Sequence, residues 1–227
     1  MFGGSSMTGY NQAKALVFRP PPGEITMTIN AGIKSTGWYL MLFAAIGVSA
    51  YALSLGFLPA IRNGFVDNML LTTPSAALLH FLGGGIVLLA GASQFHKGWR
   101  TRYPRLHRWL GRVYVGGVLI GGIAGLYLAF FASGGLAARF GFGLLAVLWL
   151  VSTALAFRYI LKRDIKLHQR WMIRSYAMTL GAVTLRIWLP LFLMLGVPFD
   201  QAYPAIAWLA WVPNLIIAEW VFLRSRQ

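Results

Sequence analysis

Two stretches of this sequence repeat nearly the same set of chemically active residues. The first is LHRWLGRVYV, Leu106 to Val115, and the second is LHQRWMIRSYA, Leu167 to Ala177. If Gln169 is omitted, both read His, Arg, Trp, Arg and Tyr in the same order. The paired positions are His107 and His168, Arg108 and Arg170, Trp109 and Trp171, Arg112 and Arg174, and Tyr114 and Tyr176. Each phrase precedes a long apolar run, which suggests two helices that begin in the same way.

The histidines of the repeat predict a possible haem site. Histidine is a well-attested axial ligand of haem iron, and helix bundles bind cofactors between facing helices. If the two helices run parallel, His107 and His168 lie at one level and could ligate a single b-type haem from both faces. His96 is a substitute for either ligand. Nearby arginines suit the propionates, because a guanidinium binds a carboxylate bidentately; they are Arg108, Arg112, Arg170 and Arg174.

The same phrase has a simpler interpretation as a membrane anchor. Trp and Tyr favour the membrane–water interface, and arginine extends to lipid phosphates. On this interpretation each helix needs one anchor, and the phrase recurs for that reason. Anionic lipid headgroups, a quinone carbonyl or a phosphorylated ligand could also bind this basic face.

A second polar group is expected on the other side of the membrane. His80 lies 16 residues before His96, or about 24 Å along a helix at 1.5 Å per residue. Arg186 lies in the middle of the apolar run VTLRIWLP, and a charge there is costly unless it faces the bundle interior with a partner. Asn214 of the last run lies at a similar depth and could hydrogen-bond to it. His80, Arg186 and Asn214 therefore form a predicted outer polar site, whose alternative is an arginine that only ties helices together.

Composition explains where these residues must lie. The chain has 227 residues, of which 58% are hydrophobic and 11% charged, whereas a soluble domain has about a quarter charged. An apolar run of about 20 residues can span the hydrocarbon core as a helix. The sequence has six such runs, at about 36–58, 75–96, 109–131, 140–160, 173–196 and 203–223. We expect an all-α, polytopic membrane helix bundle with about six transmembrane helices.

The net charge of +15 follows the membrane topology and does not indicate nucleic acid. Lys and Arg gather before the first run, between the second and third, between the fourth and fifth, and after the last. Short loops rich in Lys and Arg stay in the cytoplasm. All four basic regions fall on one side of a six-helix arrangement, which predicts an inner-membrane protein with both termini cytoplasmic and in contact with anionic lipid.

The expected organisation is a polar N-terminal tail at 1–35, a six-span domain at 36–223 and a short C-terminus at 224–227. Cysteine is absent from the sequence, which excludes disulfides and thiolate metal ligands. Glycines recur at near-helical spacing in the second and third runs, a pattern typical of close helix contact. They include Gly83, Gly84, Gly85, Gly117 and Gly121.

The stretch from His80 to Pro190 resembles a bacterial multi-pass membrane family catalogued as domain of unknown function 2306. The similarity lies in HFLGG at His80, LHRWLGRVYV at His107, DIKLHQRWMIRSYAMT at His168 and AVTLRIWLPL at Arg186. It implies a family core at 75–196. The polar positions that match the family do not include His96. The resemblance implies no activity, and the similarity in layout to small b-type cytochromes is one of fold alone.

The sequence is compatible with three classes of function, and it does not decide whether the protein is an enzyme. The leading one is an electron-transfer protein with haem b between His107 and His168. The second is a non-catalytic accessory subunit that packs against other subunits of a respiratory or photosynthetic membrane complex. The third is a small-molecule transporter, supported by Arg186 and Asn214 but without paired signals for broken helices.

Overall fold

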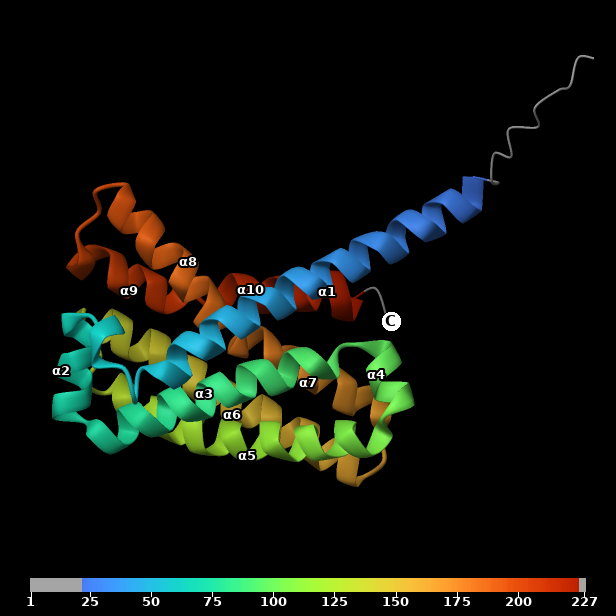
Figure 1. Cartoon of the computed structure of the whole chain (residues 1–227), viewed down its shortest axis with the longest axis horizontal. Coiled ribbons are helices and arrows are strands. Elements are labelled where there is room, and N and C mark those ends of the chain that lie inside the picture. The colour runs from blue at the N-terminus through green and yellow to red at the C-terminus, as the bar shows by residue number, and fades with distance from the viewer. Residues whose placement is uncertain (1–21, 225–227) are drawn as a thin grey trace, which may run out of the picture. The chain divides into compact units, whose positions relative to one another are not determined.

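The computed structural model describes residues 22–224, and within this range it contains helices and no strand (Figure 1). The chain divides into two units, Met1–Gly37 and Trp38–Gln227, and the bundle described below is that of the second. Six of its helical stretches are long and apolar enough to cross a membrane. The predicted all-α polytopic bundle is therefore confirmed. Residues 1–21 and 225–227, which include most of the expected N-terminal tail, lie outside the described residues.

The first half of the bundle consists of five α-helices. Helix α1 (Pro22–Ser54) is followed by the one-turn η1 (Pro59–Ile61), the short α2 (Gly64–Thr72) and α3 (Pro74–Gln94). Then come the short α4 (Lys97–Arg102) and the long α5 (Pro104–Ala129). The sequence analysis did not predict α2 or α4, because neither is long enough to give a spanning signal.

The second half begins with α6 (Gly135–Leu161) and continues with two spans that are interrupted. The fifth span consists of α7 (Ile165–Thr179) and α8 (Gly181–Met194). The sixth consists of α9 (Phe199–Leu209), α10 (Val212–Ile217) and the π-helical η2 (Ala218–Leu223). Pro213 explains the second interruption, because it has no N–H to bond back to Leu209.

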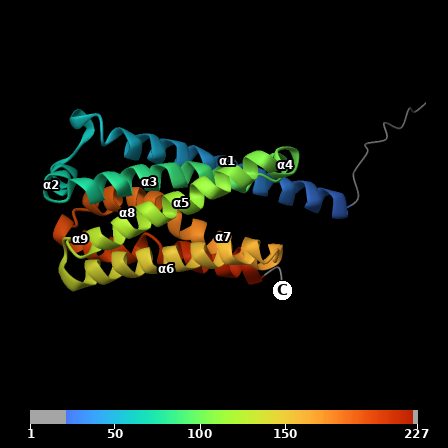
Figure 2. The same cartoon turned by 90° about the horizontal axis from the view of Figure 1, so that it is seen from below.

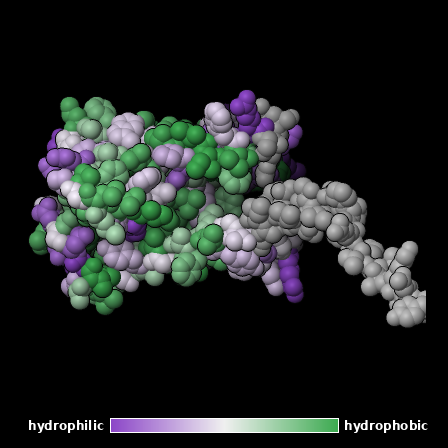
Figure 3. All heavy atoms as spheres, turned by 90° about the horizontal axis from the view of Figure 1, so that it is seen from above, coloured by the Kyte–Doolittle hydropathy of each residue, from purple (hydrophilic) through white to green (hydrophobic). Residues whose placement is uncertain are grey.

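The bundle has two distinct ends (Figures 1 and 2). One carries α4 and the α6–α7 connection, and is called here the basic end because Lys and Arg gather there. The other carries α2 and the α8–α9 connection and is called the α2 end. On the face drawn in Figure 3, apolar residues cover the middle and hydrophilic residues gather toward the ends, as a bilayer requires.

Glycine contacts set the distance between α3 and α5. A Cβ on Gly83 would lie 3.0 Å from the Cα of Gly121, and one on Gly117 would lie 2.5 Å from a Val87 methyl group. Small residues allow two membrane helices to approach this closely. The predicted packing role of this glycine pattern is therefore confirmed for these positions.

A layer of buried hydroxyl groups joins three helices in the middle of the bundle. The Tyr114 hydroxyl of α5 hydrogen-bonds to Ser175 (2.8 Å) and Thr179 (2.9 Å) of α7. Ser175 also bonds to Thr153 of α6 (2.6 Å), and Trp149 Nε1 donates to Thr179 (2.9 Å). Since lipid offers no alternative partner, these bonds hold α5, α6 and α7 in register.

The tyrosines of the repeated phrase lie in this core. Tyr114 is 0% exposed and Tyr176 is 2% exposed, and the Tyr176 hydroxyl donates to the Leu88 carbonyl (3.0 Å). The anchor interpretation is therefore wrong for both tyrosines, although Trp109 is 58% exposed. The reason is helix phase: α5 and α7 begin before the phrase, so the two tyrosines lie more than two turns inside and face the bundle.

The predicted spans agree with the structure in order, but their boundaries differ. The third and fifth begin at Pro104 and Ile165, before the predicted residues 109 and 173, because charged residues occupy their first turns. His107 and His168 are consequently each the fourth residue of their helix. Asp164 caps α7 by accepting a hydrogen bond from the Leu167 N–H (2.9 Å).

Candidate functional site

A cavity of about 360 Å³ lies in the bundle toward the α2 end. It is lined by residues from α1, α2, α3, α5 and α6, from both halves of the fifth span (α7 and α8), and from the sixth span. Its walls are mainly apolar and aromatic, and its polar side chains include His80, Arg186, two asparagines, three threonines and Ser133. Cavities of this size and character typically bind small molecules.

Arg186 is the main charge of this cavity. Its Nη1 donates to the Ala182 carbonyl (2.8 Å), and its Nε is buried without a hydrogen-bond partner. The guanidinium carbon lies 5.2 Å from the Tyr51 ring centroid, a cation–π contact. Both ion pairs found among residues 36–224 involve other arginines, so Arg186 has no acidic partner there. A guanidinium has five N–H donors, and within the same residues the structure shows a hydrogen bond from Nη1 alone, to Ala182.

His80 supplies a hydrogen-bond acceptor, whereas Arg186 supplies donors. Its Nδ1 lies 2.9 Å from the Gly121 carbonyl oxygen, which can only accept, so Nδ1 carries the proton. The neutral ring therefore has its lone pair on Nε2. Gly125 makes room for this ring, because a Cβ there would lie 2.8 Å from Nδ1. The Arg186 charge is close enough to act on the His80 ring.

The two helix interruptions lie against each other beside this cavity. Gly181, which opens α8, and Ala210, which precedes α10, both line it. The Ala210 carbonyl accepts hydrogen bonds from the Thr184 hydroxyl and from Asn214 Nδ2 (3.0 Å). Asn214 also donates to Thr184 (3.1 Å) and to the Ala177 carbonyl (3.3 Å). Side chains thus satisfy backbone groups at the interruption, as irregular backbone at membrane depth requires.

Asn214 does not join Arg186, contrary to the predicted hydrogen bond. Its amide is occupied by the interruption, and it does not line the cavity. The predicted outer site thus has two of its three residues, His80 and Arg186, at one cavity. The depth expected from sequence could not tell on which side of its helix the Asn214 amide lies.

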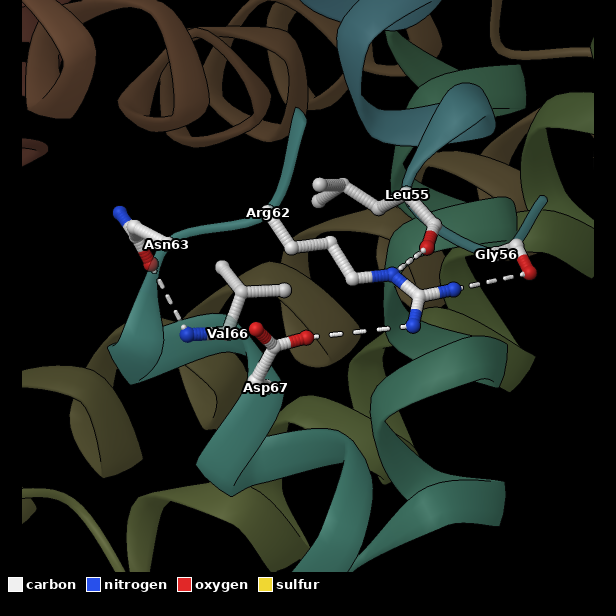
Figure 4. A network of polar contacts seen from close by, with 6 residues as sticks. All are labelled: Leu55, Gly56, Arg62, Asn63, Val66 and Asp67. Carbon is white, nitrogen blue, oxygen red and sulfur yellow. Dashed lines mark hydrogen bonds and ion pairs between the residues drawn. The ribbon is translucent and has the colours of Figure 1, made fainter. Parts of the chain in front are cut away.

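Helix α2 covers the cavity at the end of the bundle. Arg62, just before it, donates from Nε to the Leu55 carbonyl (2.7 Å) and from Nη2 to the Gly56 carbonyl (3.2 Å). Nη1 lies 3.9 Å from Asp67 (Figure 4). Asn63 caps α2 by accepting from the Val66 N–H (2.9 Å), and both residues line the cavity. This network ties α2 to the turn that follows α1.

The structure also brings the histidines of the repeated phrase near each other. His107 and His168 are close enough for electrostatic interaction. His168 Nδ1 lies 2.9 Å from the Ala156 carbonyl oxygen, and His107 Nδ1 is buried without a partner. His96 lies apart as the cap of α4, with Nδ1 accepting from the Trp99 N–H (3.0 Å).

The space beside His107 is small. A void of about 10 Å³, lined also by Gln94 and Arg100, is found there. It is about the size needed for one water molecule, and the buried Oε1 of Gln94 also lacks a partner. This arrangement of side chains does not form a haem-sized space at His107. Within residues 36–224, no group of three or more His, Asp or Glu side chains could hold a metal ion.

The four arginines predicted for the propionates differ between the two copies. Arg108 and Arg112 on α5 are exposed, whereas Arg170 and Arg174 on α7 are half-buried. Arg174 bonds to Glu219 through Nε to Oε1 and Nη2 to Oε2, and it stacks on Trp171 at 4.5 Å. Arg174 therefore links α7 to η2, so it already has a carboxylate partner.

A family model described as "Predicted membrane protein (DUF2306)" matches residues 77–222. This chain belongs to that family. The match extends beyond the predicted core of 75–196 and includes the sixth span, so both interruptions and the residues His80 and Arg186 lie within it. No curated protein and no solved structure matched the chain.

Proposed function

We propose that this protein is a transporter for a small anionic molecule, which binds in the cavity at Arg186. The observation that carries the proposal is a half-buried arginine that lines the cavity, whose Nε is buried without a partner and which has no acidic partner in residues 36–224. A desolvated charge without a partner is costly, and intramembrane arginines usually mark a ligand or ion pathway. An anionic ligand would supply the missing charge through bidentate hydrogen bonds.

The interrupted helices support transport over permanent binding. Secondary transporters bind their substrates near the middle of the membrane, where discontinuous helices leave backbone groups beside the site. Here two spans are interrupted at the same place, and Gly181 and Ala210 of these interruptions line the cavity. The transporter hypothesis lacked this signal in the sequence, since Leu180 stands in an unbroken apolar run.

The proposed orientation puts the basic end in the cytoplasm of a bacterium. Short loops rich in Lys and Arg remain on that side, and they flank α4 and the α6–α7 connection. The cavity then lies in the outer half of the inner membrane, with α2 between it and the outside.

Binding of benzoate to purified protein tests the proposal. Benzoate carries one carboxylate on an apolar ring, and benzamide is its neutral counterpart. We expect benzoate to bind more tightly than benzamide, and Arg186→Gln to weaken benzoate binding by about 10- to 100-fold, because a hydrogen bond to a charge contributes about 1.5–3 kcal/mol. The matched control is Arg139→Gln on α6, an exposed arginine outside the cavity. Equal affinities of the Arg186 and Arg139 variants would contradict the proposal.

Uptake of labelled benzoate into proteoliposomes tests the transport step itself. Wild-type protein should accumulate label above protein-free vesicles, and Arg186→Gln should abolish the difference while Arg139→Gln preserves it. Binding without uptake would leave a binding protein and contradict transport. Binding of phosphatidylglycerol with the same dependence on Arg186 would identify a lipid phosphate as the anion.

Haem b between His107 and His168 is a second candidate, supported by the approach of the two imidazoles. A haem there would supply one-electron chemistry, with these histidines as ligands and Arg108, Arg112 and Arg170 near the propionates. Side chains would have to move to admit it, because the void beside His107 is about 10 Å³. The absorbance spectrum of air-oxidised and dithionite-reduced protein decides this. A Soret band that is lost in His107→Ala and His168→Ala would establish the haem, and a featureless spectrum of folded, haem-supplemented protein would exclude it.

The accessory-subunit proposal is tested in the same preparation by co-purification in mild detergent.

A further inference from the structure

We infer that the anion bound at Arg186 is a hydroxylated aromatic carboxylate, and that His80 accepts the hydrogen bond of its hydroxyl group. This inference rests on the proposed function, because it specifies the ligand of the same cavity. It uses three further observations: the fixed tautomer of His80, the hydrogen bonds already made by the threonines of the cavity and the aromatic walls.

His80 is fixed as an acceptor by its neighbour. The Gly121 carbonyl takes the Nδ1 proton at 2.9 Å, and a backbone carbonyl cannot give one back. Among residues 36–224 the structure shows a hydrogen bond of His80 at Nδ1 and none at the remaining nitrogen, Nε2. Because the ring lines the cavity, a ligand that donates a proton there would satisfy it.

The three threonines that line the cavity already hydrogen-bond to the protein. Thr72 and Thr73 donate to the Asn68 and Met69 carbonyls, at 2.8 and 3.0 Å. Thr179 donates to the Ser175 carbonyl (3.1 Å) and accepts from Trp149. Arg186 offers a charged donor and His80 offers an acceptor, so a ligand complementary to both residues carries an anionic oxygen and a separate O–H.

Aromatic side chains line the same cavity as Arg186 and His80. Tyr51, Phe65, Phe142, Trp149 and Tyr203 all line the cavity. Phe65 packs at 5.3 Å from Tyr203, and Phe142 packs at 5.3 Å from the same ring. Ring pairs at such distances are favourable in offset or tilted geometry. A planar ring suits these walls and a volume of about 360 Å³, which inorganic phosphate would leave largely unfilled.

A neutral aromatic diol fits the site less well. It could donate to His80, but it would leave the charge of Arg186 unpaired. A carboxylate without a hydroxyl would pair with Arg186 and leave Nε2 of His80 without a partner. Both groups on one ring satisfy both residues.

The experiment compares 3- and 4-hydroxybenzoate with benzoate and with the two methoxybenzoates, which have similar shape but no O–H to donate. We expect one hydroxybenzoate to bind at least about tenfold tighter than benzoate, and its methoxy analogue to lose that gain. In His80→Leu, the ratio of hydroxybenzoate to benzoate affinity should fall to about one, whereas in Arg186→Gln all acids should weaken together.

Two results would overturn the inference while leaving the proposed function intact. One is binding of benzoate that depends on Arg186 but gains nothing from either hydroxyl. The other is a hydroxyl gain that persists in His80→Leu. If benzoate itself binds equally well to Arg186→Gln, the proposed function fails first. Should His80→Leu not fold, the comparison of hydroxy and methoxy acids on wild-type protein still decides, because it needs no variant.

Discussion

Around Tyr114, hydroxyl groups from three helices hydrogen-bond to one another, so that each has a partner. Arg186, in contrast, lines the cavity and carries a charge without an acidic partner among residues 36–224. The two regions are neighbours, since Trp149 and Thr179 belong to the hydroxyl layer and also line the cavity. Tyr114 and Ser175 are fully buried. Arg186 has one carbonyl acceptor, one aromatic neighbour and a buried Nε without a partner.

This difference separates polar groups that stabilise from polar groups available to a ligand. A satisfied network in a membrane bundle holds helices together. An intramembrane charge without an acidic partner reduces the stability of the ligand-free protein, and such residues are characteristic of functional sites. Variants of the hydroxyl layer should therefore lower stability, and variants of Arg186 should lower binding.

The largest loss of stability is expected for Gly91→Leu, next to the hydroxyl layer. A Cβ at this position would overlap the Tyr176 ring and lie 2.8 Å from the Tyr114 ring. Both rings are buried and the Tyr176 hydroxyl is bonded to Leu88, so neither can move freely. Overpacking costs about 1–3 kcal/mol and sometimes more. Size-exclusion chromatography should show little monodisperse protein, whereas Gly84→Leu, which has open space, should behave as wild type.

Tyr114→Phe should cost less but act in the same direction. It removes two hydrogen bonds without changing the packing of the ring, and an interhelical hydrogen bond in a membrane contributes about 0.6 kcal/mol on average and up to about 1.7 kcal/mol. We expect the free energy of unfolding in SDS titration to fall by about 1–2 kcal/mol, with benzoate affinity unchanged. A loss of affinity at wild-type stability would mean that the two regions are not separate.

Asn214→Leu should have a smaller effect on stability. The amide donates to three acceptors at the helix interruptions, and one of them, the Ala210 carbonyl, also accepts from Thr184. We expect a loss of about 1 kcal/mol and benzoate affinity within about twofold of wild type, because Asn214 does not line the cavity. Loss of binding comparable to that of Arg186→Gln would restore Asn214 to the site predicted from sequence.

Arg186→Leu should change the stability of ligand-free protein least, or raise it slightly. Replacement of a buried, unpaired charge by an apolar side chain is often neutral or stabilising, whereas the hydrogen bond to Ala182 and the contact with Tyr51 are lost. SDS titration without ligand, followed by benzoate binding, measures both effects. A destabilisation larger than that of Tyr114→Phe would show that Arg186 serves mainly to tie helices together.

Much of the fold could be predicted from the sequence. The apolar runs gave the number and order of the spans, because hydrocarbon thickness fixes the length of a helix that crosses it. The glycine spacing on α3 and α5 predicted their close contact, since a period near 3.6 residues puts small side chains on one face. Arg186 and His80 were found as candidates because polar side chains are rare in such runs.

Other features depend on contacts that a single run of sequence does not encode. Tyr114 and Tyr176 resembled interfacial anchors, because residue type and the nearby charges suggest an interface, yet the phase of each helix turns them into the core. The interruption at Leu180 has no proline to mark it; it is stabilised by Thr184 and by packing against Ala210.

The sequence by itself determined which stretches form long apolar helices and how far along each helix a residue lies, because rise per residue and hydropathy are local properties. Only the tertiary structure decided which residues meet. It brought His80 and Arg186 to one cavity, turned Asn214 away from it and gave Arg174 the carboxylate of Glu219. The physical reason is that the side chains of a helix project in all directions around its axis. Which of them face the bundle depends on neighbouring helices that lie tens of residues away along the chain.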